Sequence, residues 1–411
     1  MEVAMLAEIY PRDHARFTSL PLLGPHLDGF AVWLRSQGYP RLPIRLRVRQ
    51  APRLDALLRH RRVHRLGVLT QAQFLEFAPR VTLDDVYLSA AVRSLGSYFD
   101  VQGIFAPPVV TPRDEVIAAY RAHLDRVRGL AERTAAQHCS AASELLTFLG
   151  FDRDRTVLRR LGPQQIEAFV RTVGGRVGRA FLQHVVARLR SFLRFLAGRE
   201  EIARGLDSMI DTPRLYRGEK LPRSLPWETV QSFLAAIDRS TPKGRRDYGM
   251  FLLAATYGLR TSEIAELRLD DIEWRAGRLR VPRPKTQTPI VLPLTEEVGA
   301  ALLDHLRHPR PEPPRREVFL RFRVPAGPIL PTAVTNAFQV WSRRSGLPIP
   351  YHGPHCLRHS LAVHLLRQGT SLKAIGDLLG HRGAESTCVY LRLHVEDLRD
   401  AVLDLPQEAR S

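Results

Sequence analysis

The fold is decided near the carboxyl end of the chain, by the stretch Gly353-Pro354-His355-Cys356-Leu357-Arg358-His359-Ser360. Pro354 stands where a helix can begin, because a proline in the first helical turn has no N–H group to leave unpaired. The residues that follow have helical apolar spacing and predict a helix that ends at Gly369. His355 and Arg358 are three positions apart, so on this helix they share one face and can both approach a single anion.

Two further motifs follow this helix. Gly380, in Leu378-Leu379-Gly380-His381, is predicted to close a helix that begins near Ser371, which leaves His381 at the exit of that helix. Tyr390 lies nine residues after His381, within Glu385-Ser386-Thr387-Cys388-Val389-Tyr390-Leu391. Histidine and tyrosine side chains are both suited to acid–base or nucleophilic chemistry.

An arginine occupies a sharp corner farther upstream, in Tyr257-Gly258-Leu259-Arg260-Thr261-Ser262-Glu263. Gly258 is predicted to end one helix in a left-handed conformation and Thr261 to cap the next. Arg260 then lies beside the free backbone N–H groups of a helix start, where the two together can hold a phosphate. Taken alone, the motif more often marks a surface arginine paired with a carboxylate such as Glu263 or Asp270.

The segment 278–294 contains two short β-forming runs around a polar turn and predicts a hairpin. Lys285 lies near its tip. From there the ammonium group can reach into a groove and donate a proton to a departing oxygen, provided that neighbouring cations lower its pKa. By itself this residue is more typical of a solvated turn lysine.

Together these motifs resemble the tyrosine recombinase, or phage integrase, family. They comprise Gly-Leu-Arg with Ser-Glu, a hairpin Lys 25 residues on, His-x-x-Arg, Leu-Gly-His, and a Tyr nine residues after that His. The resemblance covers roughly residues 221–405, and to a lesser degree residues 112–203, which are similar to the helical core-binding domain of that family. It implies a mainly α protein, with helical SAM-like DNA-binding domains and an α+β catalytic domain that contains a small antiparallel sheet.

The resemblance also implies one active site and the role of each member. Tyr390 would be the nucleophile, and the activating residues would be Arg260, Lys285, His355, Arg358 and His381. Attack on a phosphodiester adds negative charge to its non-bridging oxygens, which fixed cationic donors stabilise. The phenol, with an ordinary pKa near 10, would pass its proton to His355 or a neighbouring base, and Lys285 would protonate the leaving 5′-oxygen.

Other residues of the same types receive a structural interpretation. Tyr257 falls on an apolar helix end and Tyr351 in a proline-flanked loop, so we expect both to be structural. His359 and His364 lie on the same helix as His355 and are expected to be packing or surface residues.

We expect no cofactor. A phosphotyrosine ester conserves the energy of the broken bond, so rejoining needs no ATP, and the chain has no G-x-x-x-x-G-K-[ST] loop. A metal ion is the weaker alternative, since His355, Cys356, His359, His381 and Cys388 show no structural-zinc spacing. Two other functions stay open: a type IB topoisomerase-like enzyme that relaxes DNA, and a non-catalytic DNA-binding protein on the same fold.

Composition supports a nucleic-acid partner. The chain has 61 Lys and Arg against 42 Asp and Glu, which gives a formal net charge of +19 and a pI near 10.8. Such a surface attracts polyanions, and we expect the partner to be double-stranded DNA. The three cysteines are too few and too scattered for a disulfide framework. With no signal peptide and no apolar run long enough for a membrane span, the sequence predicts a cytoplasmic, nucleoid-associated protein.

The chain is expected to have four parts. Residues 106–207 form the helical core-binding domain, 208–224 a linker, and 225–411 the catalytic domain with a tail helix. Residues 1–105 form an additional helical module, and its arginines either bind DNA or form a solvated basic face: Arg45, Arg47, Arg49, Arg59, Arg61 and Arg62. Similar patterns at offsets of 91 to 92 residues hint that this module and the next are distant repeats.

The carboxyl-terminal segment predicts assembly. Residues 395–405 have the apolar spacing of a short amphipathic helix, which needs a partner surface. In relatives such a tail docks onto a neighbouring subunit, so we expect a homotetramer on paired DNA sites. Whether accessory recombinases act beside it stays open.

Overall fold

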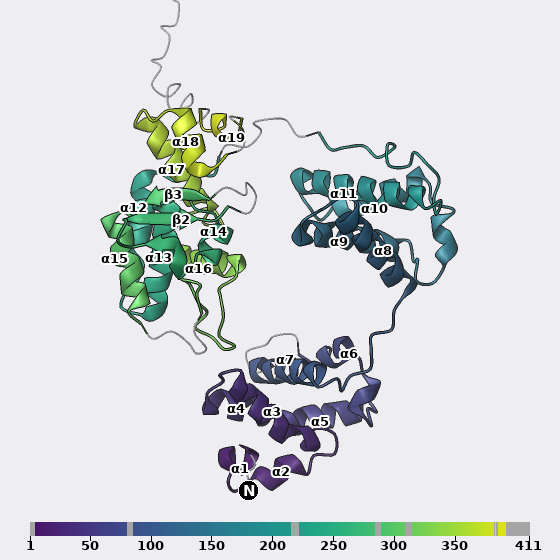
Figure 1. Ribbon diagram of the computed structural model, residues 1–411. Helices are drawn as coiled ribbons and strands as arrows, with labels where there is room; N and C mark the ends of the chain where they lie inside the picture. The colour runs from purple at the N-terminus through teal and green to yellow at the C-terminus, as the bar shows by residue number, and fades with distance from the viewer. Residues whose placement is uncertain are drawn as a thin grey trace, which may run out of the picture. The chain divides into compact units, whose positions relative to one another are not determined.

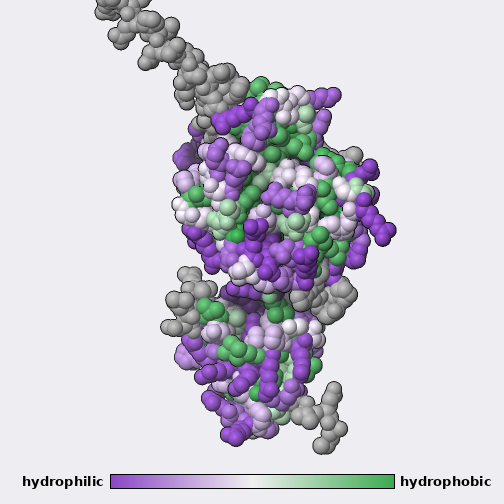
Figure 2. Space-filling model, turned by 90° about the vertical axis from the view of Figure 1, so that its left-hand side faces the viewer, coloured by the Kyte–Doolittle hydropathy of each residue, from purple (hydrophilic) through white to green (hydrophobic). Residues whose placement is uncertain are grey.

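The computed structural model describes residues 5–79, 85–214, 222–283, 289–308, 315–381, 383 and 385–391. The chain divides into two compact units, residues 105–219 and residues 1–104 together with 220–411. The described parts are mostly helical, with one small antiparallel sheet, as the sequence predicts (Figure 1). In the view of Figure 2, hydrophilic side chains cover much of the visible surface, which fits the charged composition.

The first of these units, residues 105–219, is called the central unit. It consists of α8 (Pro112–Arg126), α9 (Glu132–Phe148), the 3-10 helix η3 (Arg155–Leu158), α10 (Pro163–Gly174) and α11 (Arg179–Gly198). Each helix buries an apolar stripe in one shared core, to which α8 contributes Tyr120 and α11 contributes Phe192. The side chain of Thr111 caps α8, because its Oγ1 accepts a hydrogen bond from the backbone N–H of Asp114.

Residues 5–104 are called the amino-terminal segment. They form α1 (Met5–Ile9), α2 (His14–Thr18), α3 (Gly24–Ser36), α4 (Arg41–Val48), α5 (Ala51–His60), η1 (Leu66–Val68), α6 (Gln71–Leu75) and α7 (Val86–Val101). The prediction of an all-helical region is confirmed for the described residues. Asp55 is fully buried here, where it accepts hydrogen bonds from the backbone N–H groups of Leu22 and Leu23 at 2.9 Å each.

Residues 222–391 are called the carboxyl-terminal segment. Their helices are α12 (Trp227–Ala235), α13 (Pro242–Tyr257), α14 (Thr261–Glu266), η4 (Leu269–Asp271), α15 (Glu296–Leu306), α16 (Pro331–Ser345), α17 (His355–Arg367), α18 (Leu372–Leu379) and α19 (Glu385–Cys388). The sheet has the order β1 (Ile272–Glu273), β2 (Arg278–Val281) and β3 (Ile290–Pro293). Arg278 pairs with Pro293 and Val281 with Ile290, which confirms the predicted hairpin.

Helix α13 is the central element of this segment, since most of its residues are buried. Asp247 on α13 is fully buried, and it accepts hydrogen bonds from Arg246 and, at 2.9 Å, from the indole N–H of Trp341 on α16. The carboxylate thereby satisfies two buried donors and fixes α13 against α16. The end of α13 is therefore a rigid starting point for the corner that follows it.

The central unit begins at Phe105 and ends at Glu219. The sequence predicts a core-binding domain at 106–207 and a linker at 208–224, and this division stays a prediction. The division of the rest into separate modules at 1–105 and 225–411 stays a prediction, and the tail at 395–405 lies outside the described residues. Among the described helices, none is long and apolar enough to cross a membrane.

Candidate active site

The corner after α13 positions Arg260. Gly258 ends the helix with φ of 64°, in the left-handed region predicted for it. Arg260 itself is the N-cap residue of α14, and the sequence was wrong in giving that position to Thr261, which is the first residue of the helix. The backbone N–H of Arg260 donates to the Glu263 carboxylate at 2.8 Å, and the Arg260 guanidinium donates to the same carboxylate at 2.7 Å.

Arg358 lies at the centre of the site and is 2% exposed. Its guanidinium donates to the backbone carbonyls of Gly258 and Leu379, so it ties the end of α13 to the end of α18. Burial lowers its pKa to about 10, helped by repulsion from Arg260, so it stays charged at neutral pH. A guanidinium has five N–H donors, which leaves donors that these carbonyls do not use.

Tyr390 follows α19 and is buried, with 1% exposure. Its hydroxyl lies 2.9 Å from Nδ1 of His359, and its ring stacks at 20° on the ring of His381, with 6.3 Å between centroids. Burial raises the pKa of the phenol, while the positive charges of Arg358 and Arg260 act in the opposite direction. The phenol is therefore neutral at rest and lies next to a base and two cations.

Three histidines belong to this cluster, and two of them, His359 and His381, contact the phenol. The ring of His355 meets that of His359 edge-on, with 4.5 Å between centroids, and Nδ1 of His381 lies 2.8 Å from the hydroxyl of Thr387. The pKa of each histidine is lowered to about 4, first by desolvation and then by nearby positive charges such as Arg358. His355 lies at the rim with an exposed side chain. All three imidazoles are neutral at pH 7, so each can accept a proton.

The structure brings five of the six predicted residues together: Arg260, His355, Arg358, His381 and Tyr390. Lys285 lies outside the described residues. His359 differs from its prediction, since it contacts the Tyr390 hydroxyl and is no mere packing residue. Its position one turn after His355 and directly after Arg358 was the available sequence clue.

The remaining structural assignments hold. Tyr257 is buried at 3% exposure, and the hydroxyl of Tyr351 donates to the backbone carbonyl of Ser224. His364 stacks on Trp227 with 4.2 Å between ring centroids. These three side chains contact structural partners and take no part in the cluster around Tyr390.

Sequence reasoning missed a third arginine at the site, Arg283, just after β2. It is 7% exposed, donates to the carbonyl of Leu378 at 2.7 Å, and lies 3.9 Å from the Glu263 carboxylate. Its guanidinium packs directly on Gly380, where a Cβ would contact it. Gly380 also has φ of 63°, a left-handed conformation that favours glycine at this corner.

The lowered histidine pKa values predict a pH effect on stability. In the unfolded chain the histidines have a pKa near 6.5, so they bind protons below that pH. In the folded protein His359 and His381 stay neutral until the pH approaches 4. The stability they contribute is full above about pH 6.5 and is lost as pH falls toward 4. We expect the melting temperature to fall over this range, and to fall less in the His359→Gln/His381→Gln variant. An equal fall in both proteins would contradict the assignment.

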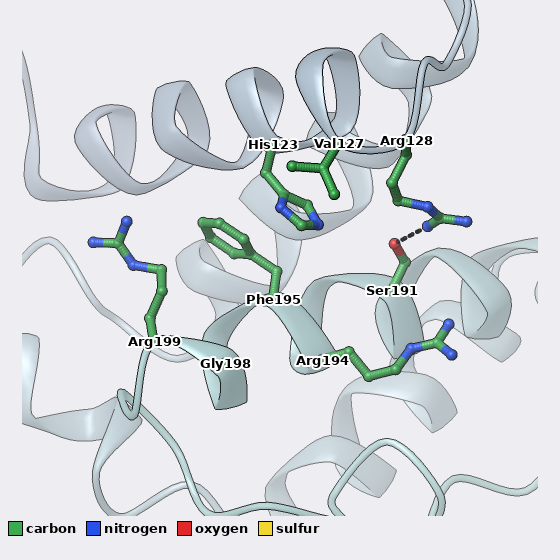
Figure 3. A pocket seen from close by; sticks show the side chains of 8 residues that line it. All are labelled: His123, Val127, Arg128, Ser191, Arg194, Phe195, Gly198 and Arg199. Carbon is green, nitrogen blue, oxygen red and sulfur yellow. Dashed lines mark hydrogen bonds between the residues drawn. The ribbon is translucent and has the colours of Figure 1, made fainter.

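A separate pocket of about 600 Å³ lies in the central unit, between the ends of α8 and α11. Figure 3 shows Arg128, Arg194 and Arg199 around it, with His123 and Phe195 between them. Arg128 donates to the hydroxyl of Ser191 at 2.7 Å. Three guanidinium groups around one hollow can accommodate an anion such as a phosphate. Within the described residues, no group of three or more His, Cys, Asp or Glu side chains could hold a metal ion.

Comparison with known proteins places this geometry in a family. The model of the phage integrase family matches residues 223–397. A protein of Sinorhizobium fredii named as an integrase/recombinase, y4rA, is 31% identical over 401 residues, which cover 95% of this chain and 97% of that protein. The tyrosine recombinase XerD of Lacticaseibacillus casei is 27% identical over 287 residues, which cover 69% of this chain and 95% of XerD.

Solved structures show the same fold. A lambda integrase dimer bound to a COC′ core site aligns with a TM-score of 0.54 and 19% identity, over 78% of this chain and 90% of that one. The XerH recombinase bound to palindromic difH substrate, in a post-cleavage complex, aligns with a TM-score of 0.54 and 16% identity, over 69% and 83% of the two chains. At these identities the likeness concerns the fold.

Proposed function

Since the chain belongs to the phage integrase family of site-specific tyrosine recombinases, we propose that it cuts and rejoins DNA through a covalent 3′-phosphotyrosyl bond to Tyr390. The observation that carries the proposal is the position of this hydroxyl, 2.9 Å from a neutral imidazole nitrogen of His359. A buried phenol beside a base and two guanidinium groups has the surroundings that an oxygen nucleophile needs.

The chemistry balances without a cofactor. The Tyr390 oxygen attacks phosphorus while its proton moves to His359. A bond forms between the Tyr390 oxygen and phosphorus, and the bond between phosphorus and the 5′-oxygen breaks. Lys285, which lies outside the described residues, is proposed to donate the proton that turns this oxygen into a 5′-hydroxyl. In the reverse step a 5′-hydroxyl attacks the phosphotyrosine and releases the phenol, which rejoins the strand.

The two arginines are proposed to act on the phosphate. Their unused N–H donors can bind the non-bridging oxygens, whose negative charge grows as the phenol attacks. Because Arg358 is held by two backbone carbonyls and Arg260 by Glu263, little reorganisation is needed when the charge develops. His355 and His381 can donate further hydrogen bonds once the phosphate has raised their pKa.

Double-stranded DNA is the proposed substrate, and a homotetramer on two paired sites the proposed assembly. Lambda integrase has been solved as a tetramer bound to a Holliday junction, which supports this for a chain of the same fold. The Arg128, Arg194 and Arg199 pocket is a proposed contact for the DNA backbone. We propose that the reaction serves a mobile element and takes place at the nucleoid. Whether accessory recombinases act beside this protein stays open.

A nicked suicide duplex tests the function. When cleavage occurs close to a nick, the short fragment that carries the new 5′-hydroxyl diffuses away, and the covalent intermediate accumulates because nothing is left to attack it. We expect the protein to form a denaturant-resistant adduct with the strand labelled on its 3′-phosphate side, and mass spectrometry to place the nucleotide on Tyr390. Retained DNA affinity with no adduct would favour a non-catalytic binding protein. Relaxation of supercoiled DNA without exchange between two sites would favour the topoisomerase alternative.

His359 should behave as the base. Glutamine can keep a hydrogen bond to the Tyr390 hydroxyl but cannot take up its proton, so we expect His359→Gln to slow cleavage about a hundredfold. Duplex affinity should be unchanged. His364→Gln on the same helix is the matched control, because His364 stacks on Trp227 and should leave the cleavage rate near wild type. Single-turnover cleavage measures both, and equal rates in the two variants would remove the base role.

A further inference from the structure

After α1 and α2, the helices α3 to α7 of the amino-terminal segment follow the order of the central unit, with α4 and α5 in the place of α9. In both, an aromatic residue on the helix that opens this order, α3 or α8, packs against an aromatic residue on the last helix, α7 or α11. Phe30 and Tyr98 have ring centroids 5.7 Å apart, and Tyr120 and Phe195 have them 5.0 Å apart. On α3 and α8 a buried leucine follows this aromatic residue four positions later, Leu34 in α3 and Leu124 in α8.

The last helices of the two segments bury the same pattern of positions. When the carboxyl ends of α7 and α11 are aligned, Leu88 corresponds to Val185, Leu95 to Phe192 and Phe99 to Leu196, all of them buried. Both helices end in the same backbone turn. The residues after them, Gly103 and Glu200, have φ of 63° and 60°, and the next N–H donates back to Phe99 and Leu196, at 3.0 and 3.1 Å.

The elements between these helices also correspond. Helices α5 and α9 each end with a left-handed residue, Arg62 and Gly150, followed by an N–H that donates back over five residues at 3.0 Å. A 3-10 helix follows in each case. Then α6 and α10 each have a glutamine as their third residue, whose side chain accepts a hydrogen bond from the N-cap N–H, Gln73 at 2.9 Å and Gln165 at 3.0 Å.

Matching order, burial and helix ends, at a spacing of about 90 residues, indicate two copies of one helical fold. The weak sequence pattern at offsets of 91 to 92 residues therefore has a structural counterpart. Charge, by contrast, is distributed differently in the two copies. Residues 38–65 of the first copy contain nine arginines and one acidic residue, whereas the corresponding residues 129–154 of the second contain two arginines and four acidic residues.

The arginines around the α8–α11 pocket have no arginine counterparts in the first copy. By these alignments Arg128, Arg194 and Arg199 correspond to the uncharged residues Gly38, Ser97 and Gln102. The first copy thus carries its positive charge on other elements of the fold. A dense run of basic residues follows the end of α5, where residues 59–65 read Arg-His-Arg-Arg-Val-His-Arg; we call them the basic loop.

The basic loop is built for contact with solvent or a polyanion. All of its residues except Val63 are exposed. Arg59 is paired with the buried Asp55 at 3.1 Å, while Arg61, Arg62 and Arg65 have no carboxylate within 4.0 Å among the residues that the structure describes. Arg62 holds φ of 58°, a backbone conformation that an arginine adopts at some cost, although glycine fills the same place in the second copy.

We propose that the amino-terminal segment is a second, tandem copy of the core-binding fold and that its basic loop binds the phosphates of double-stranded DNA. This goes beyond strand cleavage at Tyr390 and rests on the proposed function only in taking DNA as the partner. The alignment with XerD covers 95% of that protein but 69% of this chain, as expected if this chain has an added part that contacts DNA. The relative y4rA, by contrast, matches over 95% of this chain.

Salt dependence of DNA binding tests the proposal on the full chain. The probe is a long fluorescent duplex of unrelated sequence, and the variant is Arg61→Gln/Arg65→Gln. Each phosphate contact contributes about 0.9 to the slope of log affinity against log salt, so we expect the slope to shrink by nearly two. The matched control, Arg12→Gln/Arg16→Gln, removes two exposed arginines of the same segment outside the basic loop and should keep the wild-type slope.

The outcomes separate this proposal from the proposed function. Covalent capture on a short suicide duplex reports on Tyr390 and should match wild type in both variants, as should the melting temperature. A smaller slope in the Arg61/Arg65 variant alone supports the basic loop as a DNA contact, whether or not an adduct forms. Equal slopes in the two variants would overturn it, even if the adduct forms normally.

Discussion

Replacing Tyr390 with phenylalanine should abolish covalent capture of DNA while leaving duplex affinity intact. The substitution removes one oxygen, and that oxygen is the atom proposed to bond to phosphorus. The ring should keep its packing against His381, since the side chain is 1% exposed and its shape hardly changes. Loss of the hydrogen bond to His359 should cost about 1 kcal/mol of stability.

The matched control is Tyr351→Phe. This residue also loses a phenolic hydrogen bond, to the backbone carbonyl of Ser224 at 3.3 Å, but it lies outside the cluster around Tyr390. Denaturing gels of the suicide-substrate reaction should show adduct for wild type and Tyr351→Phe, and none for Tyr390→Phe. Gel shifts under native conditions should show similar affinity for all three. An adduct that persists in Tyr390→Phe would identify another nucleophile.

The predictions that succeeded depend on local sequence. Gly258 and Gly380 stop helices in a left-handed conformation that few other residues adopt. Their positions therefore fix the corners at which Arg260 and His381 lie. The hairpin of β2 and β3 follows from two short apolar-containing runs on either side of a polar turn, and β2 alternates arginines with buried apolar residues. Such features are decided within a few residues and can be predicted without knowledge of the tertiary fold.

The misses depend on contacts between distant segments. His359 lies one helical turn after His355 on α17, but only the position of Tyr390, 31 residues later in the chain, makes it a candidate base. Arg283 resembles any hairpin arginine until Glu263 and the carbonyl of Leu378 are found beside it. The sequence signal of the proposed tandem fold was similarly weak, because the pattern of buried positions and the helix ends recur while the residue types do not.

The two site arginines should respond differently to substitution by lysine. Lysine keeps the charge but loses the planar fork, so it cannot bind two phosphate oxygens in the same way. For Arg260, whose side chain is 30% exposed and paired with Glu263, we expect cleavage to slow by about a hundredfold to a thousandfold. The melting temperature should change little, because a lysine ammonium can still neutralise the Glu263 carboxylate.

Arg358→Lys should lower both the cleavage rate and the stability. Its two hydrogen bonds to the carbonyls of Gly258 and Leu379 join α13 to α18 inside the protein, and one ammonium cannot replace that fork in a site where the side chain is 2% exposed. Single-turnover cleavage and thermal unfolding measured on both variants separate the two roles. If Arg260→Lys unfolds as early as Arg358→Lys, Arg260 is a structural residue. If Arg358→Lys cleaves at the wild-type rate, the phosphate is not bound where we propose.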